Sequence, residues 1–551
     1  MSADTSSHAY SPFSPDQSYT TPPSTSLEKN IEFLKHIFPI GTSYDILTHK
    51  FLFQGTLAYW IGINGFCSNA DLQDIIKNLQ DPGFNENPEI KDIQSFLNSK
   101  IDYVQSSLSS SWQTITKSVL SGSSALFFDG FAEAILIDTR NYPTRSIEEP
   151  DTERITRGAK DGFIENILSN STLIRRRIRN PSLTFEIKTV GDISQTDVAI
   201  TYIGDLVDKT LLTEAYDRLD SLSHPYKTTK KTTKASTQKT DAARPPYPSK
   251  KASASHSVQI SSLTMGSKSL EELFVPKRFF HPLPSLFSTE RPDVACSYLL
   301  EGYVLLLVDN SPSVLVLPGT IFQFTQSPED YYKSPSVGTL NRLMRFFCII
   351  LSLFTMPVFL LLASAPSILP GRLASINADG LNPVRLFFLV LFTEFGFHLF
   401  RYASAHSSSR FSTPMSVVGG LILSEVAMEL KWSSLEIIFY ASVTLLANLA
   451  IASIEFSDAL RLYRIFMLLC TGIGTSIGYY QAPAAAGHIF LCGGTGFVIS
   501  LVLVLLSAAT TPSFAGKSYF WPLIPFQWDA LKTLLVRKPT AKAQPGKIWK
   551  H

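Results

Sequence analysis

The sequence predicts a cytosolic α+β or α/β domain of two subdomains, followed by an all-α polytopic membrane domain. Residues 346–371 contain no Asp, Glu, Lys or Arg, and neither do residues 465–516. A bilayer core takes about 20 apolar residues in helical form, so the second stretch is long enough for two spans, with a break near Gln481-Ala482-Pro483. The more polar part before residue 334 alternates between helical and strand periodicities, and the whole chain is too long for one domain.

Five parts follow from composition. The first residues are rich in Ser, Thr and Pro without an apolar core, which predicts a disordered tail and not a signal peptide. We therefore expect the part that follows to stay in the cytoplasm. The predicted parts are a tail (1–26), subdomain 1 (27–150), subdomain 2 (151–333, with a disordered basic insertion at 224–267), a transmembrane helical domain (334–510) and a cytoplasmic C-terminal tail (511–551).

Subdomain 1 shows helical and strand patterns in turn. Leu27, Ile31, Leu34 and Phe38 share one helical face. A later pair of apolar runs is joined at Asp-Gly, which tolerates positive φ in a tight turn. We predict a helix (27–38), strands around a Gly turn (50–67), two helices (71–79 and 88–108) and a hairpin (125–137).

Subdomain 2 begins with a predicted helix over 161–179, which Pro181 ends. Leu183, Phe185 and Ile187 then alternate with polar residues, as in a half-buried strand. Each subdomain thus carries a helix-plus-hairpin unit. The remaining predictions are a strand (198–203), a helix (211–222), a hairpin (303–317) turning at Asp309-Asn310, and an amphipathic connector (322–332).

The insertion at 224–267 is rich in Lys, Ser, Thr and Pro and has almost no acidic or large aliphatic residues. Such a composition predicts an unstructured loop. Two interpretations stay open, a solvated insertion or a contact with anionic lipid heads. The solvated insertion is the favoured one.

Six spans are the simplest interpretation of the membrane part. Positive charges cluster after alternate spans, which favours both termini in the cytoplasm and an even number of crossings. Residues 414–430 reach only about 25 Å as a helix, so four crossings plus a re-entrant pair is the alternative. The candidate spans are 346–371, 384–402, 414–430, 437–454 and two within 465–516.

Two predicted spans carry stripes of polar or small residues. A charge facing lipid is costly, so such stripes should face other helices or water. A hydrated lumen, close helix packing, an internal ion pair and helices lying in the interface all remain open. We predict helix packing for Gly474, Gly478, Gly493, Gly494 and Gly496. The stripes are Glu394, His398 and Arg401 in the span 384–402, and Ser416, Gly420 and Ser424, with Glu425 beside them, in the span 414–430.

No signature of catalysis, metal binding or nucleic-acid binding appears. The nucleotide, zinc-protease and serine-hydrolase motifs are absent, and the net charge of +2 gives no support for nucleic-acid binding. The five cysteines are scattered, so neither a disulfide framework nor a zinc site is expected. We therefore predict no enzyme and no cofactor. One basic cluster could bind an acidic partner or phosphate, or it could form a solvated or ion-paired helix face, which is favoured: Arg175, Arg176, Arg177 and Arg179.

A series of short motifs runs in one order along the chain, namely 170–183, 196–203, 288–294, 300–302, 308–309, 324–332 and 416–420 with Glu425. Together these motifs resemble the A subunit of GerA-type spore germination receptors, over about residues 27 to 535. The insertion at 224–267 is longer than the corresponding stretch of that family, and residues 377–382 and 404–412 also depart from its pattern.

The resemblance implies a multi-pass protein of the inner membrane of a bacterial spore, with a cytoplasmic N-terminal domain. It implies two partners, a transporter-like B subunit and a lipoprotein C subunit, and a homo-oligomer forming a nutrient-gated cation channel. Glu394, Glu425 and the face of Ser416, Gly420 and Ser424 would then line or flank the pore, where carboxylates favour cations. The alternative is a non-conducting scaffold that couples a ligand-binding subunit to downstream germination proteins.

Overall fold

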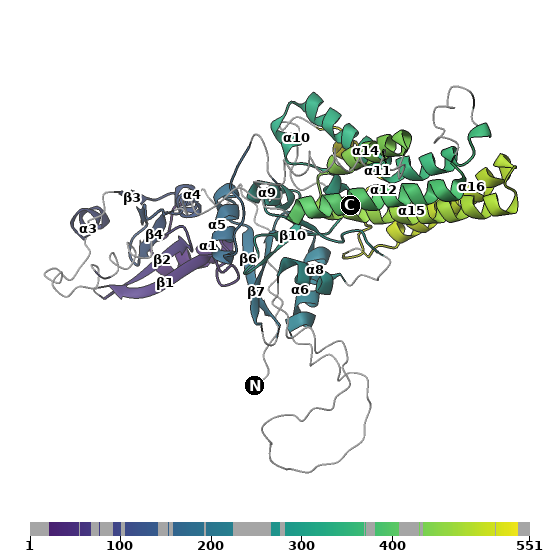
Figure 1. The fold of residues 1–551 in the computed structure, drawn as a ribbon. Helices are drawn as coiled ribbons and strands as arrows, with labels where there is room; N and C mark the ends of the chain where they lie inside the picture. Colours follow the sequence, from purple (N-terminus) through teal and green to yellow (C-terminus); the bar gives the residue numbers. More distant parts are fainter. Residues whose placement is uncertain are drawn as a thin grey trace, which may run out of the picture.

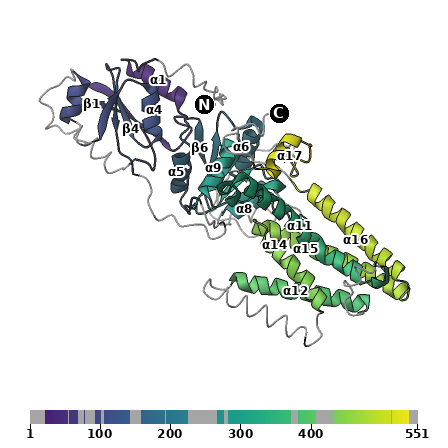
Figure 2. The ribbon, with the colours of Figure 1, turned by 90° about the horizontal axis from the view of Figure 1, so that it is seen from above.

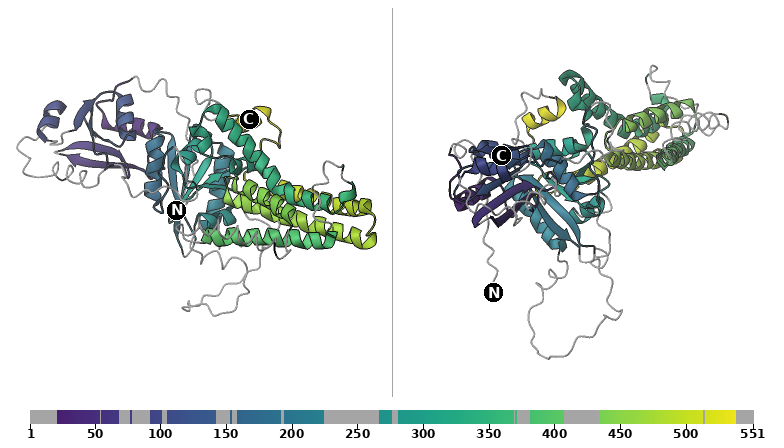
Figure 3. Two further views of the ribbon diagram at one scale, coloured as in Figure 1. Left: turned by 45° about the horizontal axis from the view of Figure 1, so that its top comes forward. Right: turned by 90° about the vertical axis from the view of Figure 1, so that its left-hand side faces the viewer.

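Two sheet-containing units and a helical bundle follow one another in the computed structural model (Figure 1). The bundle lies on the far side of the second unit from the first, as the left view of Figure 3 also shows. The structure describes residues 21–53, 55–67, 77, 92–100, 105–141, 153, 158–191, 194–223, 266–275, 281–368, 370, 381–406, 429, 434–512 and 514–537.

The first unit is a five-stranded sheet in the order β1-β2-β4-β5-β3, with each neighbouring pair antiparallel. Alternate side chains of its strands form two cores, one under α1 and α4 and the other under α3. The elements are α1 (Leu27–Ile37), β1 (Ile46–Phe53), β2 (Thr56–Ile63), α3 (Ile93–Lys100), β3 (Ser106–Ser109), α4 (Trp112–Leu120), β4 (Ser124–Phe128) and β5 (Ala134–Ile137).

The second unit repeats this topology, with an antiparallel sheet in the order β6-β7-β9-β10-β8. One face of the sheet packs on α5 and α9, and the other packs on α6 and α8. The elements are α5 (Ile167–Arg177), β6 (Leu183–Val190), β7 (Thr196–Ile203), α6 (Lys209–Ser223), α8 (Ser267–Phe274), β8 (Phe287–Thr289), α9 (Pro292–Leu300), β9 (Val304–Val308) and β10 (Val314–Leu317).

The same local contact closes both units. In the first, the Leu27 backbone N–H that begins α1 donates to Asp129 Oδ1 in the β4–β5 turn, at 2.9 Å. In the second, the Ile167 N–H that begins α5 donates to Asp309 Oδ1 in the β9–β10 turn, at 3.3 Å. A carboxylate at a helix N-terminus satisfies an orphan N–H and complements the helix dipole. The two hairpin turns predicted from the sequence therefore also cap the two leading helices.

Most of the predicted elements of the soluble part are confirmed, including the antiparallel hairpins and the first helix. The helix predicted over 161–179 is shorter, because Asn166 caps it by accepting the Ser169 N–H at 2.9 Å. The helix predicted over 88–108 is wrong at its end, where β3 pairs with β5. Helices α4, α8 and α9 have no counterpart among the predicted elements. The helix predicted at 71–79, apart from Lys77, and most of the insertion at 224–267 lie outside the described residues.

The bundle begins after two short helical turns that connect it to the second sheet. Figure 2 shows α11, α15 and α16 running side by side. Of the helices that the structure describes, α11, α15 and α16 are long and apolar enough to cross a membrane. The elements are η3 (Ile321–Thr325), α10 (Glu329–Tyr332), α11 (Pro335–Ala363), η4 (Pro366–Ile368), α12 (Pro383–His406), α14 (Leu435–Leu449), α15 (Ile454–Gln481), α16 (Ala486–Ala509) and α17 (Trp528–Leu535).

The predicted break near Gln481-Ala482-Pro483 is confirmed between α15 and α16. The span predicted over 437–454 is shorter, because α14 has 15 residues and reaches only about 22 Å. The segment 414–430 lies outside the described residues apart from Glu429. The choice between six crossings and four plus a re-entrant pair stays a prediction.

Glycine allows α15 and α16 to approach closely. A Cβ on Gly474 or Gly496 would lie 2.4 or 2.3 Å from a backbone carbonyl oxygen of the opposite helix, far inside contact distance. Gly478 and Gly493 also face close neighbours. The predicted packing role is therefore confirmed for these four residues and wrong for Gly494, which has nothing within 4 Å.

Candidate functional site

The polar stripe of α12 lies against a matching stripe of α15. Residues 457, 461 and 464 of α15 have the same spacing as the α12 stripe, i, i+4 and i+7, so both sets lie on one helical face. The contacts run in opposite chain order, as expected for antiparallel helices. They pair Glu394 with Arg464, His398 with Arg461, and Arg401 with Ser457.

Glu394 and Arg464 form the most buried of these contacts, with exposed fractions of 4% and 3%. Arg464 Nε donates to Glu394 Oε1 at 2.9 Å, and Nη2 of the same guanidinium contacts that oxygen too. Arg464 Nη1 donates to the backbone oxygen of Ser352 in α11 at 2.7 Å. Two opposite charges are thus held together where either one alone would be strongly destabilising.

Asn448 of α14 connects the rest of the network. Its Oδ1 accepts from Arg401 Nη1, from Arg461 Nη2 at 3.2 Å and from Ser457 Oγ at 2.6 Å. Its Nδ2 donates to Ser352 Oγ at 3.1 Å. One buried amide therefore joins polar groups of α11, α12, α14 and α15.

The network holds three guanidinium groups and two carboxylates. The second carboxylate, Asp458, is half exposed and lies 3.2 Å from Arg401 Nη2 and 3.3 Å from Arg461 Nη1. A cavity of about 10 Å³, the size of one water molecule, lies among Glu394, Asn448 and the neighbouring arginines. Glu394 and Arg401 of α12 thus have charged partners within the same chain.

Arg461 and Arg464 are among the positive charges counted as flanking alternate spans, since they follow the span predicted over 437–454. The structure corrects this, because both are buried inside the bundle, with exposed fractions of 6% and 3%. Their spacing relative to Ser457, which repeats that of the α12 stripe, was the signal that could have paired the two helices. Asn448 and Ser352 gave no such signal, since single polar residues in apolar helices are common.

The second predicted stripe lies outside the described residues. The structure therefore does not place it relative to the network, and its position beside a pore stays a prediction. Its members are Ser416, Gly420, Ser424 and Glu425.

The basic cluster of α5 has mostly internal partners. Arg175 is fully buried and donates to Asp45 Oδ2 at 2.7 Å and to the Leu183 backbone oxygen at 2.8 Å. Arg177 contacts both carboxylate oxygens of Asp161 at 2.6 Å, and Arg179 donates to Ser121 Oγ at 3.2 Å. Arg175 and Arg179 thereby tie the second unit to the first. Arg176 also has a contact within the chain.

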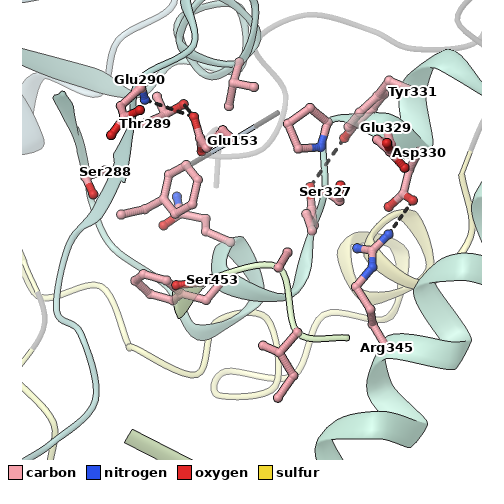
Figure 4. Close-up of a pocket in the computed structure, with 18 of the residues that line it drawn as sticks. Glu153, Ser288, Thr289, Glu290, Ser327, Glu329, Asp330, Tyr331, Arg345 and Ser453 are labelled. Carbon is pink, nitrogen blue, oxygen red and sulfur yellow. Dashed lines mark hydrogen bonds and ion pairs between the residues drawn. The ribbon is translucent and has the colours of Figure 1, made fainter. Parts of the chain in front are cut away.

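A cavity of about 990 Å³ lies where the second sheet unit meets the membrane helices. Its walls come from β8 and α9, from η3 and α10, from the first turns of α11 and from the loop between α14 and α15. Seven carboxylates and one guanidinium line it. Figure 4 shows one wall with Glu153, Ser288, Thr289 and Glu290, and an opposite wall with Ser327, Asp330, Tyr331 and Arg345.

Ion pairs fasten this junction. Arg345 of α11 contacts Asp330 of α10 and donates to the Thr325 backbone oxygen at 2.6 Å. Lys268 of α8 lies 2.8 Å from Glu455 in the first turn of α15. The soluble units are therefore bound to both α11 and α15, so a change in either part is mechanically connected to the other.

Two carboxyl groups of the cavity have raised pKa values. Burial raises the pKa of Glu153 to about 7, against hydrogen bonds from the Thr289 hydroxyl and the Glu290 N–H that lower it. Burial also raises the pKa of Glu301 to about 7, against the more distant charge of Arg342, which lowers it. Both groups therefore change charge near neutral pH.

Curated relatives are similar over almost the whole chain. Stage V sporulation protein AF of Bacillus subtilis is 31% identical over 529 residues, covering 94% of each chain. Spore germination protein B1 of Bacillus subtilis is 28% identical, covering 93% of this chain and 95% of the relative. Among solved structures, the N-terminal domain of the A subunit of the Bacillus megaterium spore germinant receptor GerK3 is 22% identical, with a TM-score of 0.37, covering 54% of this chain and 96% of that chain.

The family model described as Bacillus/Clostridium GerA spore germination protein matches residues 32–248 and 252–546. That match includes both sheet units and the membrane helices with the polar network among them. The protein therefore belongs to the GerA family of Bacillus/Clostridium spore germination proteins.

Proposed function

We propose that this chain is the A subunit of a germinant receptor in the inner membrane of the spore, and that its copies assemble into a nutrient-gated cation channel. Its family, together with the three long apolar helices of the described part of the chain, makes it a membrane protein of germination and not an enzyme. In this proposal the sheet units face the cytoplasm. A transporter-like B subunit and a lipoprotein C subunit complete the receptor.

The observation that carries the proposal is the buried contact between Glu394 and Arg464. Ionisable residues inside membrane helices are costly, and they commonly mark ion paths or moving parts. Here these residues form a network across four helices. Some of its members have a second partner within reach, since Arg401 and Arg461 also lie close to Asp458. Such a network suits an element with two arrangements, one with Glu394 paired and one with it released.

In the resting arrangement the ion pair holds α12 against α15. Opening separates the two stripes and exposes Glu394 to a water-filled path, where its carboxylate attracts cations. The second stripe, with Ser416, Gly420, Ser424 and Glu425, lines that path between neighbouring copies. Nutrient binding reaches the network through the junction ion pairs at Arg345 and Lys268.

A non-conducting scaffold is the second candidate, and one observation favours it. Glu394 Oε1 is paired with Arg464 within a single chain, so this charge has a partner without a pore. In that case the network only fixes helix positions, and the soluble units pass the signal to other proteins.

Reconstitution separates the two candidates. The receptor, purified with its B and C subunits, is placed in liposomes loaded with potassium, and its germinant is added. The channel proposal expects potassium release that Glu425→Gln reduces and that Glu133→Gln, in the β4–β5 turn of the first sheet, leaves unchanged. A correctly folded receptor that binds germinant and passes no cation supports the scaffold instead.

A further inference from the structure

The junction cavity has more carboxyl groups than its described cationic neighbours pair with. Four of its seven carboxylates have a cationic partner, namely Asp293, Glu329, Asp330 and Glu455. The other three form no ion pair with any residue that the structure describes. They are Glu153, Glu290 and Glu301.

A tyrosine hydroxyl lies near two of these carboxylates. Tyr298 of α9 lines the cavity, and within the described part of the chain its hydroxyl forms no hydrogen bond. Burial of the side chain, with the nearby Tyr303, Glu301 and Glu153, raises its pKa well above the ordinary value. The hydroxyl is therefore left for a molecule in the cavity to contact.

The cavity also presents aromatic surface. The Tyr298 ring packs against Phe287 at a centroid distance of 5.6 Å, and Phe287 packs against Phe324 at 5.7 Å. All three residues line the cavity. Aromatic faces next to carboxylates are the surroundings that bind organic cations. A volume of about 990 Å³ is far larger than an inorganic ion requires and matches the range of small-molecule sites.

The lining offers little for an anion. Its one guanidinium, Arg345, is already bound to Asp330 and to the Thr325 backbone oxygen. We infer that this cavity binds an organic ammonium compound, whose N–H groups donate to Glu301 and Glu153 while its apolar part contacts Phe287 and Tyr298. The same ammonium chemistry is available from a free amine or from an ethanolamine lipid headgroup at the membrane surface.

This inference does not rest on the proposed channel. It concerns binding by one chain at the junction, and it holds whether or not the assembled receptor conducts. Because the cavity includes the first turns of α11 and the loop before α15, an occupant there would contact the soluble unit and the membrane helices together.

The test measures binding of three probes of one shape to the full chain in nanodiscs of phosphatidylglycerol, by calorimetry. The probes are benzylamine at pH 8, benzyl alcohol and benzoate. Benzylamine is expected to bind more tightly than the neutral alcohol, and benzoate is expected not to bind. Equal binding of benzylamine and benzyl alcohol, or no binding of benzylamine, would overturn the inference.

Variants locate the site. Glu301→Gln is expected to weaken benzylamine binding about tenfold or more, as for the loss of a charge-assisted hydrogen bond. Tyr298→Phe keeps the ring and is expected to weaken it by a smaller factor, which covers the case in which Glu301→Gln does not fold. Glu133→Gln removes the same charge from the other sheet and should change nothing. Binding that is unaffected by both cavity variants contradicts the inference.

Two further arms identify the source of the cation. If replacing part of the lipid by phosphatidylethanolamine weakens benzylamine binding, the lipid headgroup is the occupant, and if it does not, a free amine is. Potassium chloride that displaces benzylamine at equal concentration would instead assign the cavity to an inorganic cation and refute an organic one.

Discussion

Removing the Glu394 carboxylate should destabilise the membrane bundle by several kcal/mol. Glu394→Gln keeps the shape and one acceptor oxygen but leaves Arg464 as a buried cation without its anion. Breaking a buried ion pair from one side costs about 3–5 kcal/mol. Arg464 keeps its two contacts with Ser352, and the new amide oxygen still accepts a hydrogen bond. We therefore expect the lower end, about 3 kcal/mol.

The assay is reversible unfolding of the chain in mixed micelles with sodium dodecyl sulfate, followed by circular dichroism. Glu455→Gln is the matched control, because it removes a carboxylate from the same helix bundle at a half-exposed ion pair with Lys268. That change should cost about 1 kcal/mol or less. Equal costs for the two variants would refute the reasoning.

A double variant separates the pair from the individual side chains. Glu394→Leu with Arg464→Met replaces both charges by apolar groups of similar size, a change that is often neutral or stabilising in buried pairs. The double variant should therefore recover most of the stability that Glu394→Leu alone loses. Additive losses would mean that the two residues do not interact in the bilayer.

Three other predictions follow from single contacts. Gly474→Leu should separate α15 from α16 and strongly reduce the folded yield, while Gly494→Leu, with open space around it, should be tolerated; the readout is monodisperse protein after size exclusion. Arg175→Gln should lower the stability of the soluble units by about 3–5 kcal/mol in urea unfolding, because Asp45 loses its buried partner. Glu301→Gln should remove a pH dependence of the stability. Because the pKa of Glu301 is raised from 4.5 to about 7, its contribution to stability is complete below pH 4.5 and is lost as the pH rises through 7. The melting temperature of the wild type should therefore fall relative to that of the variant between pH 4.5 and 7.

The fold class followed from local patterns because those patterns are set by burial. Strand alternation at Leu183–Ile187 and the Asp129-Gly130 turn are visible in the chain, and both occupy the predicted places. Helix α9 was missed because its buried residues alternate with Ser297 and Asp293 without a strong apolar stripe. Its start at Pro292 was the available signal.

The candidate site was predictable on one side only. The spacing of Glu394, His398 and Arg401 identified a polar face, but a pattern within one helix does not name its partner. Arg464 lies 70 residues from Glu394 in the sequence. Its positive charge was explained equally well as a flanking charge under the positive-inside rule. The junction cavity had no sequence signal, since its carboxylates come from segments that meet only in the folded chain.

The most direct test is cation release from spores that carry Glu394→Gln, compared with wild type and Glu425→Gln, as nutrient is titrated. If the pair with Arg464 holds the resting state, Glu394→Gln spores should release potassium at lower nutrient concentrations, and Glu425→Gln should reduce the amount released. Release with an unchanged threshold and an unchanged amount in both variants would contradict the account.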